Sequence, residues 1–440
     1  MINPQENTNL IIHGDSMTAL KELPDNSVDS VVTDPPYGLS FMGKHWDYDV
    51  PSVDLWKEVL RVLKPGGFLL SFAGTRTYHR MAVNIEDAGF EIRDMISWLY
   101  GSGFPKSLNI GKQIDKIQGN DREDLGEYDT RSKYDNCERK SIGDVSKTIY
   151  KAGIKDTKSQ LTKGNSDWEG WGTALKPACE PIVVARKPLS EKNVASNCLK
   201  WGTGGINIDG CRIDLNGDKK IGGFGSAKSG YQNGEFGDNG NEDYKCKWKE
   251  NTQGRFPANI ILDEEAGKIL DEQTFGKVGN GHWSQTKVTG FGEFGNGKSE
   301  YFGVGEKDKE KGGASRFFYC AKAGKKERNL GCEELEEIES VFPGANTFDE
   351  YGNRIRKDGS IIPPLKSKNN HPTVKPIKLM QYLVKLVTKN GGVCLDPFLG
   401  SGTTAMACIK EGMNYIGIEL EEEYIKIANA RIKAVEDTLV

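Results

Sequence analysis

The sequence predicts an α/β fold in which a circularly permuted, Rossmann-like sheet is built from both ends of the chain. Residues 10–100 alternate apolar strand-like runs with helix-like runs, as parallel α/β units do. A strand at 393–395, a glycine turn and a helix from Thr403 form a further unit, and only 21 residues follow Glu419. Because so short a remainder cannot finish a sheet, the strands near the N-terminus must complete it.

The N-terminal elements follow from apolar spacing and turn residues. Apolar residues recur at helical spacing from 53 to 63, and Pro65-Gly66-Gly67 is expected to end that helix. Ser16 is a suitable N-cap for the first helix. In order, we expect a strand at 10–12, a helix at 16–23, a strand at 28–32, a helix at 53–63, a strand at 68–72, a helix at 75–88 and a strand at 92–100.

The middle of the chain is less regular. Residues 112–170 are charged and polar with little periodicity, which indicates an insertion that is partly mobile. The apolar run 181–185 lies between Pro177 and Pro188 and predicts a strand antiparallel to 92–100. Residues 189–366 carry glycine-rich aromatic stretches such as 222–225 and 291–295, and a loop this long is better explained as a separate irregular lobe. Order returns with a helix at 376–388, the 393–395 strand, the Thr403 helix, a strand at 415–418 and a closing helix.

Composition restricts the classes of function. A chain of 440 residues can bury a core and carry a second lobe, while a net charge of −4 gives no overall basic field, so DNA binding must come from local patches. None of the nine cysteines pairs at the two-residue spacing of zinc sites, so no metal is expected. No run approaches the roughly 20 apolar residues that span a bilayer. We therefore expect a soluble, cytoplasmic protein without a membrane partner.

The C-terminal unit has the pattern of a cofactor loop. Gly400, Gly402 and Ala405 match G-x-G-x-x-A after a strand, and Glu419 lies 23 residues after Asp396, where an acid can accept hydrogen bonds from ribose hydroxyls. The carboxylate of Asp396 would repel the pyrophosphate of a nicotinamide cofactor. It would attract the ammonium of S-adenosylmethionine, which we therefore predict as the cofactor.

The N-terminal unit carries the string Asp34-Pro35-Pro36-Tyr37 directly after a strand, where open α/β sheets bind ligands. The prolines hold Asp34 and the Pro35 carbonyl stiffly as two acceptors, which suits the two hydrogens of an exocyclic amine of adenine or cytosine. Tyr37 offers a face on which an extruded base can stack. No cysteine follows a proline, which counts against methylation of a ring carbon.

These two motifs resemble those of the DNA amino-methyltransferases. The order, with the catalytic motif first and the cofactor motif D-P-F-x-G-S-G last, is similar to the beta class. The resemblance implies that Asp34, Pro35, Pro36 and Tyr37 are catalytic and that a target recognition domain lies between the motifs. It also implies that the cofactor contacts Asp15, His371, Thr373, Lys375, Asp396, Pro397, Phe398, Gly400, Gly402, Thr403 and Glu419.

The resemblance divides the chain into five segments and supplies a DNA partner. We expect 1–118, 171–188 and 367–440 to form the catalytic domain, 119–170 to be a variable insertion and 189–366 to recognise the target. Basic and aromatic residues between 311 and 328 suit phosphate contact and base stacking. The residues expected to bind double-stranded DNA are Arg316, Lys322, Lys325 and Lys326.

The first residue of the catalytic motif favours one base but leaves alternatives. In this family D-P-P-Y is typical of transfer to N6 of adenine, with base flipping. Cytosine N4, RNA or a protein glutamine are alternative acceptors, and a DNA-binding module without catalysis is a further reading. The target sequence, a cognate restriction endonuclease and a homodimer are left open by the sequence.

Overall fold

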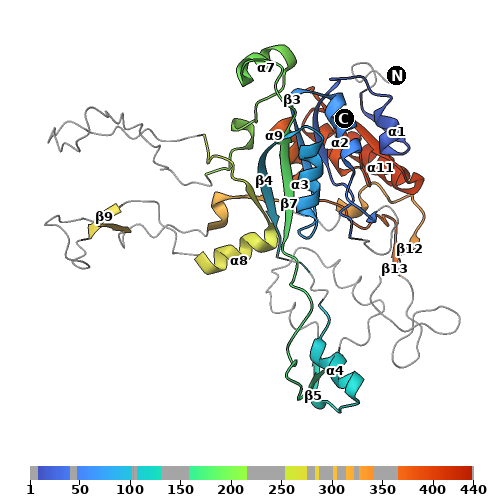
Figure 1. The fold of residues 1–440 in the computed structure, drawn as a ribbon, viewed down its shortest axis with the longest axis vertical. Coiled ribbons are helices and arrows are strands. Elements are labelled where there is room, and N and C mark those ends of the chain that lie inside the picture. The colour runs from blue at the N-terminus through green and yellow to red at the C-terminus, as the bar shows by residue number, and fades with distance from the viewer. Residues whose placement is uncertain are drawn as a thin grey trace. The chain divides into compact units, whose positions relative to one another are not determined.

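The computed structural model describes residues 8–39, 47–101, 103, 107–129, 158–215, 253–274, 283–286, 301–304, 314–321, 327–340 and 365–438. The chain divides into two compact units (Figure 1), one formed by Met1–Ser102 with Cys179–Val440 and the other by Gly103–Ala178. No helix in the described ranges is long and apolar enough to cross a membrane.

Among the described residues, nine strands of the first unit form one mixed sheet. Neighbouring strands are parallel from β1 to β3, and β7 is antiparallel to both β3 and β4. Strands β14 and β15 lie between β1 and β2, which confirms the permuted order. Across the sheet the strands are β1 (Leu10–His13), β15 (Asn414–Glu419), β14 (Val393–Asp396), β2 (Val28–Thr33), β3 (Leu63–Phe72), β7 (Cys179–Arg186), β4 (Glu91–Leu99), β8 (Ile260–Asp263) and β11 (Tyr319–Ala321).

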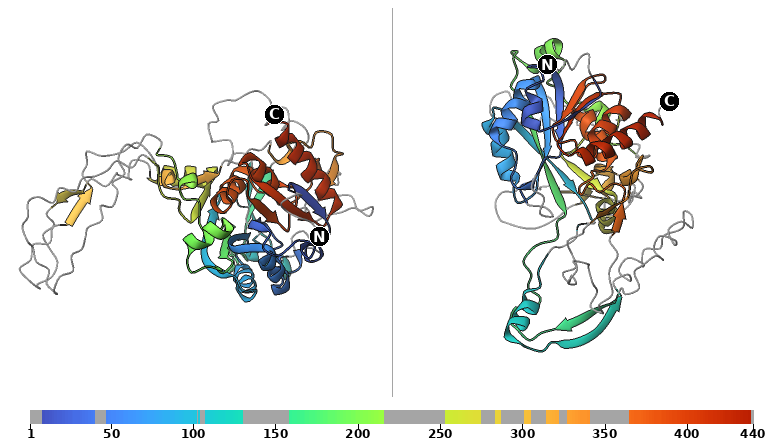
Figure 2. Two further views of the ribbon diagram at one scale, coloured as in Figure 1. Left: turned by 90° about the horizontal axis from the view of Figure 1, so that it is seen from above. Right: turned by 90° about the vertical axis from the view of Figure 1, so that its right-hand side faces the viewer.

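Helices cover both faces of this sheet and enclose two apolar cores. Along β3, Leu69 belongs to one core and Phe68 and Leu70 to the other, because successive strand side chains point to opposite faces. In Figure 2 the blue helices lie on one side of the sheet and the red helices on the other. The first group is α1 (Ser16–Leu20), α2 (Val53–Val62) and α3 (Tyr78–Asp87), and the second is α9 (Ile377–Val387), α10 (Thr403–Lys410) and α11 (Glu422–Glu436).

The start of α1 corrects the sequence prediction. Asp15, not Ser16, is the N-cap, because its carboxylate accepts a hydrogen bond from the Thr18 amide at 3.0 Å. The Ser16 hydroxyl donates instead to the carbonyl of Pro397 at 2.5 Å. The helix also ends at Leu20, earlier than predicted. Adjacent residues that can both cap a helix are distinguished by these tertiary contacts.

Prolines and glycines also lie differently from the prediction. The stretch Pro65-Gly66-Gly67 is inside β3, which starts at Leu63, rather than between a helix and a strand. The pairing of β2 with β3 shifts register between Val28 and Ser30, and such an irregularity accommodates proline and glycine in a strand. Pro376 is the extended N-cap of α9 instead of its first helical residue.

The segment predicted as a separate lobe contributes strands β8 and β11 to the main sheet, and β8 runs parallel to β4. The glycine-rich stretches 222–225 and 291–295 lie outside the described residues. The predicted antiparallel pairing of the 181–185 strand with β4 is confirmed. Smaller elements of this region are α7 (Val194–Trp201), η3 (Asp209–Cys211), α8 (Glu264–Thr274), η5 (Ala314–Phe317), η6 (Glu327–Asn329) and the antiparallel pairs β9 (Trp283–Thr286) with β10 (Tyr301–Val304) and β12 (Ile338–Ser340) with β13 (Leu365–Ser367).

The second unit contains α4 (Ile110–Gln118) and an antiparallel pair, β5 (Glu123–Asp129) and β6 (Lys158–Lys163). Arg122 holds it together, since its guanidinium donates to the carboxylates of Glu169, at 2.8 Å, and of Asp115. The insertion expected at 119–170 lies within this unit, together with α4.

Candidate active site

Three acids stand at the same edge of the sheet, where parallel strands end. Asp34 follows β2, while Asp396 and Glu419 are the last residues of β14 and β15, and these three strands are neighbours. The hydroxyl of Thr33 donates to Asp396 at 2.7 Å, across 363 positions of the chain. The two motifs recognised at opposite ends of the sequence therefore meet at the carboxyl edge of one sheet.

Asp396 is a buried acid held by neutral groups. One carboxylate oxygen accepts from Thr33 and from the Phe398 amide at 3.1 Å, and the other accepts from the Thr404 hydroxyl at 2.5 Å. Burial raises the pKa of Asp396 to about 6, and these hydrogen bonds oppose the rise. A cation beside this carboxyl would stabilise its ionised form.

The glycine turn after β14 is built for close approach. Gly400 and Gly402 have φ values of +54° and +81°, which only glycine adopts readily. The Gly400 amide donates to Glu419 at 2.7 Å, and burial raises the pKa of that carboxyl. A Cβ on Gly400 would lie 2.6 Å from Nε2 of His371, so the imidazole lies directly against the turn.

Arg431 of α11 supports this turn from inside the protein, and no sequence pattern pointed to it. Its side chain is fully buried and donates to the Ser401 carbonyl at 2.6 Å and to the Thr403 hydroxyl at 3.0 Å. Burial lowers the pKa of Arg431 to about 10. Thr403, which was expected to touch the cofactor, is thus engaged by a structural arginine.

The catalytic motif forms a closed polar cluster. The carboxylate of Asp34 accepts from the Tyr37 hydroxyl at 2.7 Å and from the Lys375 ammonium at 2.5 Å. Glu180 of β7 lies 3.4 Å from both the ammonium and the hydroxyl. Lys375 was expected beside the cofactor, and in the structure its ammonium forms an ion pair with Asp34.

The charges of this cluster shift two pKa values. Burial lowers the pKa of Lys375, but the Asp34 and Glu180 carboxylates more than offset it, so the net shift is upward. Burial and the same two carboxylates raise the pKa of Tyr37 well above its usual value. The lysine is therefore charged and the phenol neutral at neutral pH.

Asp47, which the sequence analysis did not single out, fixes the backbone after the catalytic motif. The buried carboxylate of Asp47 accepts from the amides of Tyr37, at 2.7 Å, and of Gly38, at 3.0 Å. Gly38 has a φ of +66°. This contact holds the turn that presents Tyr37.

The remaining residues expected at the cofactor are placed as follows. Asp15 caps α1 through one carboxylate oxygen, which accepts from the Thr18 amide at 3.0 Å and from the Thr18 hydroxyl at 3.2 Å. The His371 ring packs edge-on against Tyr424, with ring centroids 4.5 Å apart. The Thr373 amide donates to His371 at 3.4 Å, and Phe398 packs against the core that contains α1, α2 and α3.

A family model described as DNA methylase, N6_N4_Mtase, matches residues 28–188 and 228–430. The chain belongs to this family.

Individual relatives match the chain over short stretches. The Type II methyltransferase M.BglI of Bacillus subtilis is 43% identical over 72 residues, which is 16% of this chain and 21% of that protein. The Type II methyltransferase M2.DpnII of Streptococcus pneumoniae is 44% identical over 73 residues, 17% of this chain and 27% of that protein. The chain thus matches less than a third of the length of these curated relatives.

Solved structures of similar proteins align over most of the chain with low scores. The M1.HpyAVI–SAM complex is 14% identical, covers 96% of this chain and 98% of its own, and has a TM-score of 0.35. The cytosine-N4-specific PvuII DNA methyltransferase is 13% identical, covers 98% and 91%, and has a TM-score of 0.41.

The residues expected to touch DNA are only partly described. Lys322, Lys325 and Lys326 lie outside the described residues. The Arg316 guanidinium lies 5.1 Å from the ring centre of Phe317, and that of Arg255 lies 4.7 Å from the same ring. The DNA-binding role of this segment stays a prediction.

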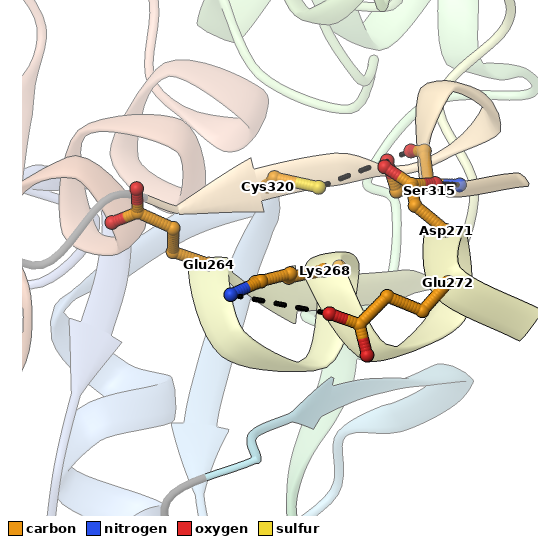
Figure 3. A pocket seen from close by; sticks show the side chains of 7 residues that line it. Glu264, Lys268, Asp271, Glu272, Ser315 and Cys320 are labelled. Carbon is orange, nitrogen blue, oxygen red and sulfur yellow. Dashed lines mark hydrogen bonds and ion pairs between the residues drawn. The ribbon is translucent and has the colours of Figure 1, made fainter. Parts of the chain in front are cut away.

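A cleft of about 430 Å³ between α8 and β11 holds none of the residues discussed above (Figure 3). Three of its seven lining residues are acids and one is a lysine, Lys268, which lies 3.9 Å from Glu272, so the cleft does not suit a DNA phosphate. The labelled lining residues are Glu264, Lys268, Asp271, Glu272, Ser315 and Cys320.

Proposed function

We propose that this protein transfers a methyl group from S-adenosylmethionine to the N6 amine of adenine in double-stranded DNA. One observation carries the proposal. Asp34 and Asp396 project from the ends of neighbouring parallel strands and are linked through Thr33, whose hydroxyl donates to Asp396. An acceptor for an amine and an attractor for a cation therefore lie side by side.

The residues at the glycine turn fit S-adenosylmethionine. Asp396 is buried among neutral donors, so the ammonium of the cofactor would supply its missing counter-charge. One oxygen of Glu419 accepts from the Gly400 amide and the other from the Glu421 amide, and the carboxylate has further acceptor capacity for a ribose hydroxyl. Asp15, His371 and Thr373 are assigned to the cofactor by the family resemblance. When bound, the cofactor supplies an electrophilic methyl carbon, and the electron pair of the broken bond stays with sulfur.

The motif at Asp34 prepares the base. Asp34 and the Pro35 carbonyl accept the two amine hydrogens, which withdraws the nitrogen lone pair from the ring and turns it toward the methyl carbon. After the N–C bond forms, the nitrogen loses one proton, to the Asp34 carboxylate or to water. Tyr37 stacks on the base once the base has left the helix, as chemistry within duplex DNA requires.

Two features support the finer assignments. An aspartate at the first position of the motif is typical of adenine transfer in this family, as the sequence resemblance indicates. Residues 189–366, which lie between the two motifs, are assigned to recognition of the target, with Arg316 and the three lysines Lys322, Lys325 and Lys326 contacting DNA.

Incubation of the protein with tritiated S-adenosylmethionine and unmethylated bacterial DNA tests the proposal. After hydrolysis we expect the label in N6-methyladenine. Label in N4-methylcytosine alone would overturn the base assignment. Cofactor binding without any label in DNA would favour a binding module without catalysis.

A further inference from the structure

The Lys375 ammonium fills a site whose other members are the residues that bind the base. Its three hydrogens meet three acceptors: Asp34 at 2.5 Å, the Tyr37 hydroxyl at 3.3 Å and Glu180 at 3.4 Å. The lysine side chain is only 9% exposed. An ammonium has three donors, and here two of its acceptors belong to the catalytic motif and the third is Glu180 of β7.

Without this ammonium the site would hold two carboxylates at close range. Asp34 and Glu180 both contact the Tyr37 hydroxyl, at 2.7 and 3.4 Å, and their side chains are 17% and 24% exposed. Two carboxylates that share a site cannot both stay ionised easily, so one of them takes up a proton. A protonated Asp34 would be a poor acceptor for an amine.

Among the described residues, the other titratable groups that interact with this cluster are neutral or acidic. Burial raises the pKa of Tyr100 to about 12, so its phenol is neutral. Asp396, which interacts with Asp34, is a further acid. The aromatic ring of Phe72 lies 4.8 Å below the ammonium and favours a cation there. Lys375 is the charge that balances Asp34 and Glu180.

We propose that Lys375 is a positioning residue for methyl transfer, which keeps Asp34 ionised and oriented by balancing Glu180, rather than a ligand of the cofactor. This inference rests on the proposed function and refines it. The ammonium holds one oxygen of Asp34 and the Tyr37 hydroxyl holds the other, so the orientation of the carboxylate toward the amine is defined.

Two consecutive residues hold the segment that carries Lys375. The Arg328 guanidinium donates to the carbonyl of His371 at 2.6 Å, and the Glu327 carboxylate accepts from the Ile377 amide at the start of α9. Both contacts come from η6, so the lysine is clamped from either side. Because this segment is held in place before the base binds, the Lys375 side chain loses little conformational entropy when the base binds.

A double-mutant cycle with Lys375→Met and Glu180→Gln tests the proposal, with the exposed Lys378→Met as matched control. At neutral pH we expect Lys375→Met to lower kcat by about 100-fold, the scale of one lost electrostatic contact at a reacting centre. Its dissociation constant for S-adenosylmethionine should stay within about twofold, and the acid limb of the pH–rate profile should move to higher pH. In the Glu180→Gln background the loss in kcat should shrink to below about tenfold, because no second carboxylate remains.

Three results would overturn the inference. A dissociation constant for the cofactor that rises with kcat retained would return Lys375 to the cofactor site. An equal loss of kcat in both backgrounds, without a shift of the acid limb, would show a structural role only. Normal kcat in Lys375→Met would remove the lysine from the reaction. If Lys375→Met does not fold, Lys375→Arg, which keeps the charge, must retain the wild-type acid limb. Failure of wild-type protein to methylate DNA would refute the proposed function instead.

Discussion

The Thr33 hydroxyl donates to the carboxylate of Asp396 at 2.7 Å, although 363 positions separate the two residues. Thr33 ends β2 directly before Asp34, and Asp396 ends β14, its parallel neighbour. This bond joins the residue assigned to the cofactor with the strand that presents the residue assigned to the base. Five expectations follow from this arrangement.

Cofactor binding should depend on pH through Asp396. The pKa of this acid is about 6, and only its ionised form attracts an ammonium. The dissociation constant for S-adenosylmethionine should therefore be about tenfold higher at pH 5 than at pH 7, which calorimetry can measure. Thr33→Val removes a bond to the ionised form and should move the midpoint to higher pH. Thr388→Val is the matched control, because the Thr388 hydroxyl bonds Ser30 and not Asp396. This change should leave the midpoint unchanged. A flat dissociation constant across this range would contradict the assignment.

Asp396 should also reduce the stability of the protein without cofactor. Its raised pKa favours the protonated form on folding, so its contribution to stability is present below pH 4 and is lost as the pH rises through about 6. Asp396→Asn should then increase the free energy of unfolding at pH 7 by about 1 to 3 kcal/mol. At pH 4 the two proteins should be equal. A variant that is less stable at pH 7 would argue against this cause.

Gly400→Ala should weaken cofactor binding more than it weakens folding. A Cβ there would press on Nε2 of His371 at 2.6 Å, in addition to the cost of a positive φ. Gly391→Ala is the matched control, because its φ is +73° and no atom lies within 4 Å of the added Cβ. Both changes should cost about 1 to 2 kcal/mol of stability in thermal unfolding, and Gly400→Ala alone should raise the dissociation constant. Equal binding by the two variants would remove the turn from the cofactor site.

Arg431→Met should destabilise the glycine turn. The change leaves the Ser401 carbonyl and the Thr403 hydroxyl without the guanidinium that they accept from. We expect a loss of about 2 to 4 kcal/mol in denaturant unfolding, the range for breaking a buried charged network. The exposed Lys433→Met, on the same helix, should change stability by less than about 0.5 kcal/mol. A similar small effect at both positions would show that the turn does not depend on Arg431.

Apolar periodicity was enough to predict seven of the nine strands of the sheet, but not β8 and β11, which come from the segment expected to form a separate lobe. Apolar runs located these strands, and the sheet has the expected permuted order, in which β14 lies beside β2. The boundaries were less accurate where two signals compete. Asp15 and Ser16 are both good N-caps, and only the bond from Ser16 to Pro397 decides between them.

Long-range polar pairs in the candidate site were beyond the sequence pattern. Lys375 and Asp34 are 341 positions apart, and a lysine before a proline carries no signal of its acid partner. Arg431 occupies one position of a helix whose other charges face water, so its burial follows only from packing against the glycine turn. The motifs marked the ends of the strands, and the fold determined which side chains meet there.

The rate of methyl transfer to unmethylated DNA by Asp34→Asn, at saturating S-adenosylmethionine, tests most directly whether the two distant motifs form one active site. We expect at least a 100-fold fall, about the cost of losing one group that stabilises the reacting atoms, with the dissociation constant of the cofactor unchanged. Asp54→Asn, an exposed change on α2, should transfer methyl groups at the wild-type rate. A wild-type rate for Asp34→Asn would contradict the account.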